Sequence, residues 1–157
     1  MKSTILLDTN LLLLFTVGST KREYVEKHKR LSNFCLQDFD LLAETLSAAS
    51  AILLFPNTLT ETSNLAAYIE EPARSEIFHT LRTIIHECDE RFVTSKAAID
   101  CPEFIRLGLA DSVLLSQAEA DFVVLTADLD LYVATVTRGS EAVNFNHLRD
   151  SHFPVAI

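Results

Sequence analysis

The sequence has few of the residues that interrupt regular structure and few that form crosslinks. Its 157 residues include 3 glycines, 4 prolines, 3 cysteines and no tryptophan. So little glycine and proline, with 48% hydrophobic residues, excludes a disordered chain. Cys35, Cys88 and Cys101 are odd in number and lack C-x-x-C spacing, which disfavours a disulfide framework or a zinc site. They favour reduced thiols in a cytoplasmic protein.

The sequence also lacks a long apolar run and an excess of positive charge. Asp8 and Asn10 interrupt the opening apolar segment, which falls far short of the ~18 residues that indicate a membrane helix. We therefore expect no secretory leader and no membrane partner. The formal net charge of −9 disfavours nucleic-acid binding unless several acids hold metal ions. The length, without repeats or linkers, predicts a single domain over residues 1–157.

Short apolar segments alternate with longer amphipathic ones. We predict buried strands at 4–7, 51–55 and 121–126, weaker strands at 91–94 and 142–145, and helices at 31–50, 58–70, 74–90, 107–118 and 129–137. The strands show no polar alternation, which is typical of parallel strands covered on both faces. This pattern predicts an α/β fold, a three-layer α/β/α sandwich around a central, mostly parallel sheet. Sites in such folds form at the carboxyl ends of the strands.

Acidic residues follow these strands or face inward from a helix. Asp8 follows the first strand, Glu61 follows the second, and Asp128 and Asp130 follow 121–126. Asp111 shares a helix face with leucines, and the spacing places Glu61 on the apolar, inward side of its helix. Each acid has a plain structural alternative: helix capping for Asp8 and Asp128, a capping box for Glu61, and the helix dipole for Asp111. Together they predict a cation site, because converging carboxylates repel one another.

The ligand types indicate which cation this site would hold. The expected ligands are carboxylate oxygens, without cysteine or histidine. Oxygen-only sites of this kind favour Mg²⁺ or Mn²⁺.

Four segments of the chain resemble the PIN-domain family in their order and spacing. They are LLDTNLLL, LTETSNLA, LGLADSVLL and VVLTADLDLY, and their order and spacing match the family over nearly the whole chain. The resemblance implies a metal-dependent ribonuclease that uses Mg²⁺ or Mn²⁺. It identifies Asp8, Glu61, Asp111 and Asp128 as the catalytic and metal-binding acids.

The resemblance extends to supporting residues and partners. Asp130 matches an accessory acid position, Thr9 and Thr126 match hydroxyl residues that support the site by hydrogen bonding, and Asn10 fits beside them. Because the family includes VapC-type toxins of toxin–antitoxin pairs, the resemblance also implies a cognate antitoxin and a homodimer as expected partners.

An RNA substrate requires positive charge near the acidic edge. Segment 21–30, KREYVEKHKR, has five Lys/Arg and two Glu, a local charge of 5 − 2 = +3. Its cations suit phosphates and its tyrosine suits a base, whereas the same spacing also fits a solvated helix with internal ion pairs. Two further arginines lie near the acid segments. The candidate RNA contacts are Lys21, Arg22, Tyr24, Arg106 and Arg138.

Two other function classes stay open. A phosphatase-like or receiver-like doubly wound protein also has an acidic pocket. A receiver, however, needs an acceptor Asp after a middle strand and a Lys after a late one, and neither 51–55 nor 121–126 is followed by such a residue. The second alternative is a catalytically silent PIN-fold protein that acts as a protein- or RNA-binding module, which the net charge of −9 allows.

Overall fold

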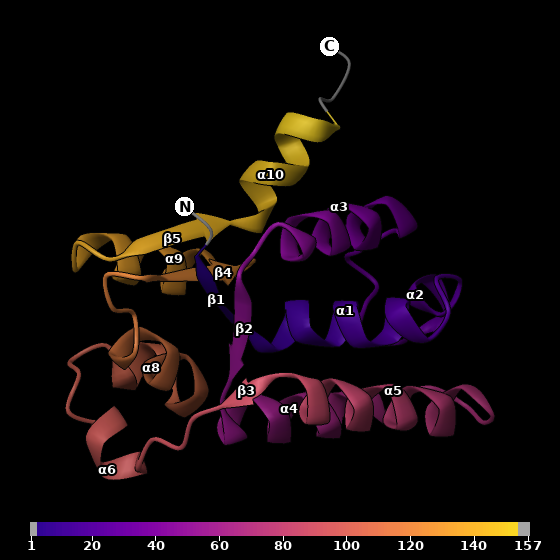
Figure 1. Ribbon diagram of the computed structural model, residues 1–157, viewed down its shortest axis with the longest axis horizontal. Helices are drawn as coiled ribbons and strands as arrows, with labels where there is room; N and C mark the ends of the chain where they lie inside the picture. Colours follow the sequence, from indigo (N-terminus) through magenta and orange to yellow (C-terminus); the bar gives the residue numbers. More distant parts are fainter. Residues whose placement is uncertain (1–2, 154–157) are drawn as a thin grey trace.

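The computed structural model describes residues 3–153, whose strands form one parallel sheet (Figure 1). The strands are β1 (Thr4–Leu7), β2 (Ala51–Leu54), β3 (Asp89–Glu90), β4 (Phe122–Thr126) and β5 (Glu141–Asn144). Their order across the sheet is β3-β2-β1-β4-β5, and every pairing is parallel. The strand order reverses between β1 and β4, so the topological switch point lies there.

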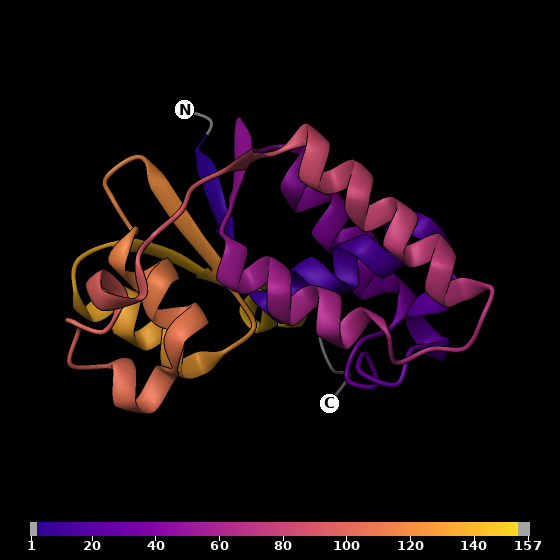
Figure 2. The same ribbon diagram turned by 90° about the horizontal axis from the view of Figure 1, so that it is seen from below.

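Helices cover both faces of the sheet. Figures 1 and 2 show α1, α3, α4 and α5 on one side and α6 and α8 on the other. The predicted α/β/α sandwich with a parallel sheet is therefore confirmed. The helices of the described residues are α1 (Thr9–Thr20), α2 (Tyr24–Lys27), α3 (Leu36–Ser47), α4 (Pro56–Ala66), α5 (Ala73–Glu87), α6 (Ser95–Ala98), α7 (Phe104–Leu107), α8 (Leu109–Ser116), α9 (Leu129–Thr137) and α10 (Phe145–His152). Within residues 3–153, none of them combines the length and apolar content that a membrane crossing requires.

Alternate residues of each central strand enter different cores. Ile5 and Leu7 lie in the larger core with α1, whereas Leu6 between them lies in the smaller core with α8. In β2, Leu54 belongs to the larger core and Leu53 to the smaller one. Successive strand residues point to opposite faces, so both sets must be apolar when helices cover both faces. Coverage of both faces by helices therefore explains the uninterrupted apolar runs in the sequence.

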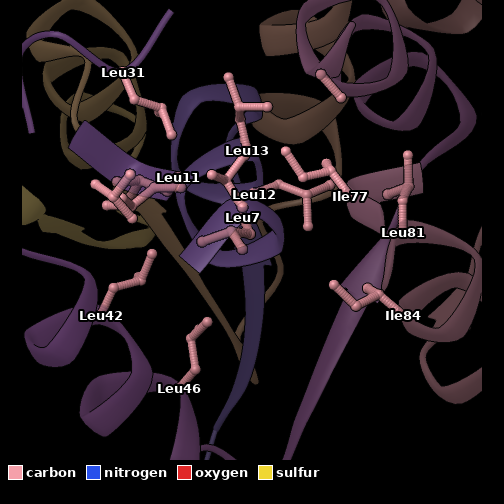
Figure 3. Close-up of a cluster of buried hydrophobic side chains, with 14 of the residues drawn as sticks. Leu7, Leu11, Leu12, Leu13, Leu31, Leu42, Leu46, Ile77, Leu81 and Ile84 are labelled. Carbon is pink, nitrogen blue, oxygen red and sulfur yellow. The ribbon is translucent and has the colours of Figure 1, made fainter. Parts of the chain in front are cut away.

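Helix α1 is the centre of the larger core. Leu11, Leu12, Leu13 and Leu14 are all buried, as expected for a helix that neighbours enclose on every side. Figure 3 shows Leu11, Leu12 and Leu13 among side chains that include Leu42 of α3 and Ile77 of α5. The helix therefore has a fixed position, and its first residue directly follows Asp8.

Most sequence-predicted elements are confirmed, and one is wrong. The predicted strand 4–7 and helix 129–137 agree with β1 and α9 to the residue. The predicted strand 91–94 is absent, because β3 ends at Glu90 and the following residues have no regular structure. The neighbouring strand β2 ends at Leu54, whose carbonyl accepts the Arg91 N–H at 2.9 Å. Beyond that bond the segment has no strand to pair with.

Gly18 allows α1 and α3 to pack closely. It is buried in α1, and a Cβ at this position would overlap the ring of Phe39 in α3. We predict that Gly18→Ala lowers the free energy of unfolding by about 1–3 kcal/mol, although alanine alone favours helix by ~1 kcal/mol. Urea unfolding measures this. Ser19→Ala is the control, since Ser19 is exposed on the same helix. A Gly18→Ala protein as stable as the control would contradict the close contact.

Candidate metal centre

Four carboxylates from separate segments gather at the carboxyl edge of the sheet. Asp8 follows β1, Asp128 follows β4, Glu61 lies in α4 and Asp111 lies in the first turn of α8. Figure 1 shows β1 and β2 running toward the edge where α1 and α4 begin. The charges of Asp8, Asp128 and Glu61 each raise the pKa of Asp111. Since such coupling weakens with distance, the four acids form one electrostatic group beside the switch point.

Asp8 is the buried anchor of this group. It is 4% exposed. One carboxylate oxygen accepts the Leu11 N–H at 2.9 Å, and the other accepts the Thr126 hydroxyl and the Ala127 N–H, the latter at 2.9 Å. Burial is the largest influence on the pKa of Asp8 and raises it, the charge of Asp128 also raises it, and these three bonds lower it, with a net rise. Asp8 therefore caps α1 and also belongs to the acidic group, so the two explanations from the sequence are compatible.

Thr126 links the acids that follow β1 and β4. Its hydroxyl donates to Asp8 and accepts the Asp128 N–H at 2.9 Å. Asp128 in turn caps α9, its carboxylate accepting the Leu131 N–H at 3.1 Å. The side chain of Asp128 is otherwise exposed. Thr126 is thus the buried hydroxyl that holds both segments at the switch point.

Glu61 lies opposite the start of α1. The Thr9 hydroxyl donates to its carboxylate at 3.0 Å. The capping-box explanation is wrong, because α4 begins at Pro56 and Thr58 lies inside the helix. The expected inward orientation is also wrong, since Glu61 is exposed. Its carboxylate instead lies at the surface beside the acid group and receives a hydrogen bond from the residue after Asp8.

Asp111 has a strongly raised pKa. Burial raises its pKa first, and the charges of Asp8, Asp128 and Glu61 raise it further, to about 7. It is half-buried in the first turn of α8, which Gly108 enters with φ of 80° and without a capping side chain. The helix dipole favours a carboxylate there, yet the other acids and burial outweigh that effect.

The donor set fits a hard divalent cation by its chemistry. All four side chains offer oxygen, which Mg²⁺ and Mn²⁺ prefer, and a cation would relieve the repulsion that raises the pKa of Asp111. As the side chains now lie, no three His, Cys, Asp or Glu residues within 3–153 form a ready metal cluster. Glu61 is bonded to Thr9 and Asp128 caps its own helix. Coordination therefore requires side-chain rotation around Asp8, which its three bonds hold in place.

Two predicted site residues, Asp130 and Asn10, lie at the margin of the acid group. Asp130 is exposed in the first turn of α9 and is not among the charges that raise the pKa of Asp111. Asn10 is exposed in the first turn of α1. Within the described part of the chain, neither side chain hydrogen bonds to the four acids.

The predicted RNA contacts of segment 21–30 lie away from the acids. They follow α1, whose 12 residues span ~18 Å at ~1.5 Å per residue. Tyr24 is 7% exposed and its hydroxyl donates to Glu76 at 2.8 Å, so its ring is not free to stack a base. Lys21 pairs with the same Glu76 at 3.4 Å, and Arg22 pairs with Asp40 at 2.6 Å. These partners lie in other helices, Glu76 in α5 and Asp40 in α3, and not within the segment itself.

The two remaining arginines differ from each other. Arg138 donates to Glu103 at 2.9 Å and so joins α9 to the start of α7. Arg106 lies in α7 immediately before α8, and its side chain is exposed. Of the five basic or aromatic candidates, Arg106 is the cation that is both near the Asp111 helix and open to solvent.

Comparisons with known proteins add no relative to this description. No family model, no curated protein and no solved structure matches the chain. The resemblance to PIN domains therefore stays a prediction that rests on the residues themselves.

The raised pKa of Asp111 predicts a pH-dependent cost in stability. The folded state holds the Asp111 proton up to pH about 7, whereas the ordinary pKa is 3.8. Stability therefore falls as pH rises through this window. We predict that Asp111→Asn raises the melting temperature in metal-free buffer at pH 8, by several degrees, and that this gain shrinks toward pH 4.

Thermal unfolding from pH 4 to 8 tests this expectation. Asp130→Asn removes a nearby carboxylate that does not raise the pKa of Asp111, so it controls for net charge. Equal shifts for both variants, or a less stable Asp111→Asn protein at pH 8, would contradict the raised pKa of Asp111.

Proposed function

We propose that this protein is a PIN-type endoribonuclease that depends on Mg²⁺ or Mn²⁺, with Asp8, Glu61, Asp111 and Asp128 as its acids. The supporting observation is the pKa of Asp111, which burial and three carboxylates from other segments raise. Capping explains Asp8 and Asp128 separately. Neither Glu61 nor Asp111 caps a helix, so capping does not explain why they face the same edge. A cation-dependent reaction accounts for all four carboxylates together.

The surroundings of each acid indicate its role in hydrolysis. A bound divalent cation supplies an acidified water and neutralises charge on a phosphodiester. Asp8, buried and held by three hydrogen bonds, provides a fixed reference for the site. Asp111 holds a proton near neutral pH, and ligation would release it. Glu61 and Asp128 are exposed, so they are the acids nearest to an incoming phosphate chain.

RNA cleavage tests the proposal directly. We expect wild-type protein with Mn²⁺ or Mg²⁺ to cleave a labelled RNA, and Asp8→Asn and Asp111→Asn each to lose roughly 100-fold or more of the rate, because charge stabilisation is removed. Asp130→Asn should retain most of the activity. Unfolding curves for each variant separate loss of chemistry from loss of fold. Equal cleavage by all four proteins would exclude this site.

Arg106 is the cation best placed to hold the RNA backbone. We predict that Arg106→Ala raises KM for RNA several-fold while kcat changes little, since a phosphate contact contributes to binding and not to the chemistry. Arg22→Ala is the matched control, because Arg22 pairs with Asp40 at the far end of α1. Steady-state kinetics at fixed ionic strength measure both. The same KM change in both variants would remove Arg106 from the substrate path.

A silent binding module is the alternative function. It is favoured by the net charge of −9 and by the pairing of Lys21, Arg22 and Arg138 with carboxylates. Calorimetric titration with Mn²⁺ separates the two functions, because the nuclease requires the ion. Heat that Asp111→Asn abolishes supports the nuclease. Absence of heat at millimolar Mn²⁺, together with absence of cleavage, favours the module.

A further inference from the structure

The segment after β3 presents an aromatic ring to solvent from a fixed backbone. The Arg91 N–H bonds to the Leu54 carbonyl at 2.9 Å, and its guanidinium donates to Gln117 at 3.0 Å. Val93 packs against the smaller core. Phe92, between these two anchors, is 76% exposed. Figure 1 shows this segment leaving β3 toward α6, on the side of the molecule that carries α8.

Phe92 forms one wall of a cavity that one of the four acids also lines. The cavity has a volume of about 300 Å³ and lies between the starts of α4 and α8. Phe92, Val93 and Leu109 give it apolar walls, while Asn57, Thr60 and Ser95 give it neutral hydrogen-bonding groups. Glu61 also lines it, and so does Ala110, the residue before Asp111. A molecule in this cavity would therefore lie directly beside the proposed reaction centre.

The lining determines which kind of group fits. None of the lining residues, all of which belong to the described part of the chain, is Lys, Arg or His. With Glu61 as its one charged member, the cavity disfavours a phosphate. An exposed aromatic face beside amide and hydroxyl groups suits a flat, uncharged group that both stacks and hydrogen bonds. In a nucleic acid that group is the base.

We infer that this cavity binds one unpaired nucleobase, stacked on Phe92, next to the phosphate that the acids would cleave. The inference rests on the proposed ribonuclease function and names its substrate class as single-stranded or loop RNA. A base inside a duplex already stacks on its neighbours and pairs with the other strand, so it cannot enter the cavity without being unpaired. Phe92 is on this view a specificity-determining residue and not a catalytic one.

Fluorescence of 2-aminopurine measures stacking without cleavage. A single-stranded oligoribonucleotide with this base is titrated, in Mg²⁺, with the cleavage-impaired Asp111→Asn protein. We expect the fluorescence to be quenched. Adding Phe92→Ala should remove the quenching and weaken binding about tenfold, the scale of one stacked base. Phe92→Tyr should restore both.

Ile105→Ala is the matched control, since Ile105 is 89% exposed but does not line the cavity. Quenching and affinity that survive Phe92→Ala, or that fall equally in Ile105→Ala, would overturn the inference.

Kinetics separate failure of the subsite from failure of the nuclease. If wild type cleaves RNA, Phe92→Ala should raise KM about tenfold with a smaller change in kcat, and wild type should prefer single strands over duplex. Cleavage with an unchanged KM and no such preference overturns the subsite and leaves the nuclease standing. Phe92-dependent quenching without cleavage by wild type supports the base-binding cavity and rejects the nuclease.

Discussion

The buried carboxylate of Asp8 is the constraint on which the carboxyl edge of the sheet depends. Its three hydrogen bonds join the end of β1, the first turn of α1 and the residues that follow β4. A charged group costs several kcal/mol to bury without partners, so these bonds are a condition for placing α1 where it lies. Loss of any one would loosen the switch point, because β1 and β4 meet there.

The fold can sustain a repulsive acid group because its core is large on one side. Leu11 to Leu14 are fully enclosed, and burial of each such side chain contributes roughly 1.5–3 kcal/mol. The acid group beside them acts in the opposite direction, because burial and the charges of the neighbouring acids raise the pKa of Asp111. Stability is thus concentrated in α1 and its neighbours, while the sheet edge that α1 supports retains unfavourable charge. Such a division is typical of sites where function is maintained at a cost in stability.

The sequence was sufficient to predict those elements in which the local pattern and burial agree. Strand β1 and helix α9 follow from apolar runs bounded by capping acids, and the positions of Asp8 and Asp128 follow from them. Tertiary contacts decided the rest. The segment after Glu90 has strand-forming residues, but β2 ends too early to pair with it. Glu61 matched a capping box by spacing, whereas the helix begins earlier, at Pro56.

The contacts of the basic and aromatic residues were the least predictable, because they too depend on tertiary packing. The partners of Lys21 and Arg22 are 18 or more positions away in sequence, so no local spacing reveals them. Phe92 carried no signal at all, because one exposed aromatic residue is ordinary. Its interest comes from the cavity it shares with Glu61, and that cavity exists only when α4 and α8 are brought together.

The net charge of −9 becomes compatible with an RNA substrate once attraction to the backbone is not the main source of affinity. Within segment 21–30, Lys21 and Arg22 are paired with carboxylates, and Arg106 alone would supply few counter-ion contacts. A divalent cation among the acids would reverse the local sign of charge at the place where a substrate phosphate would approach. Stacking in a neutral cavity needs no positive charge and adds affinity that salt barely screens. An acidic protein that holds RNA through a cation and a base would thereby discriminate against duplexes, whose phosphates are accessible but whose bases are not.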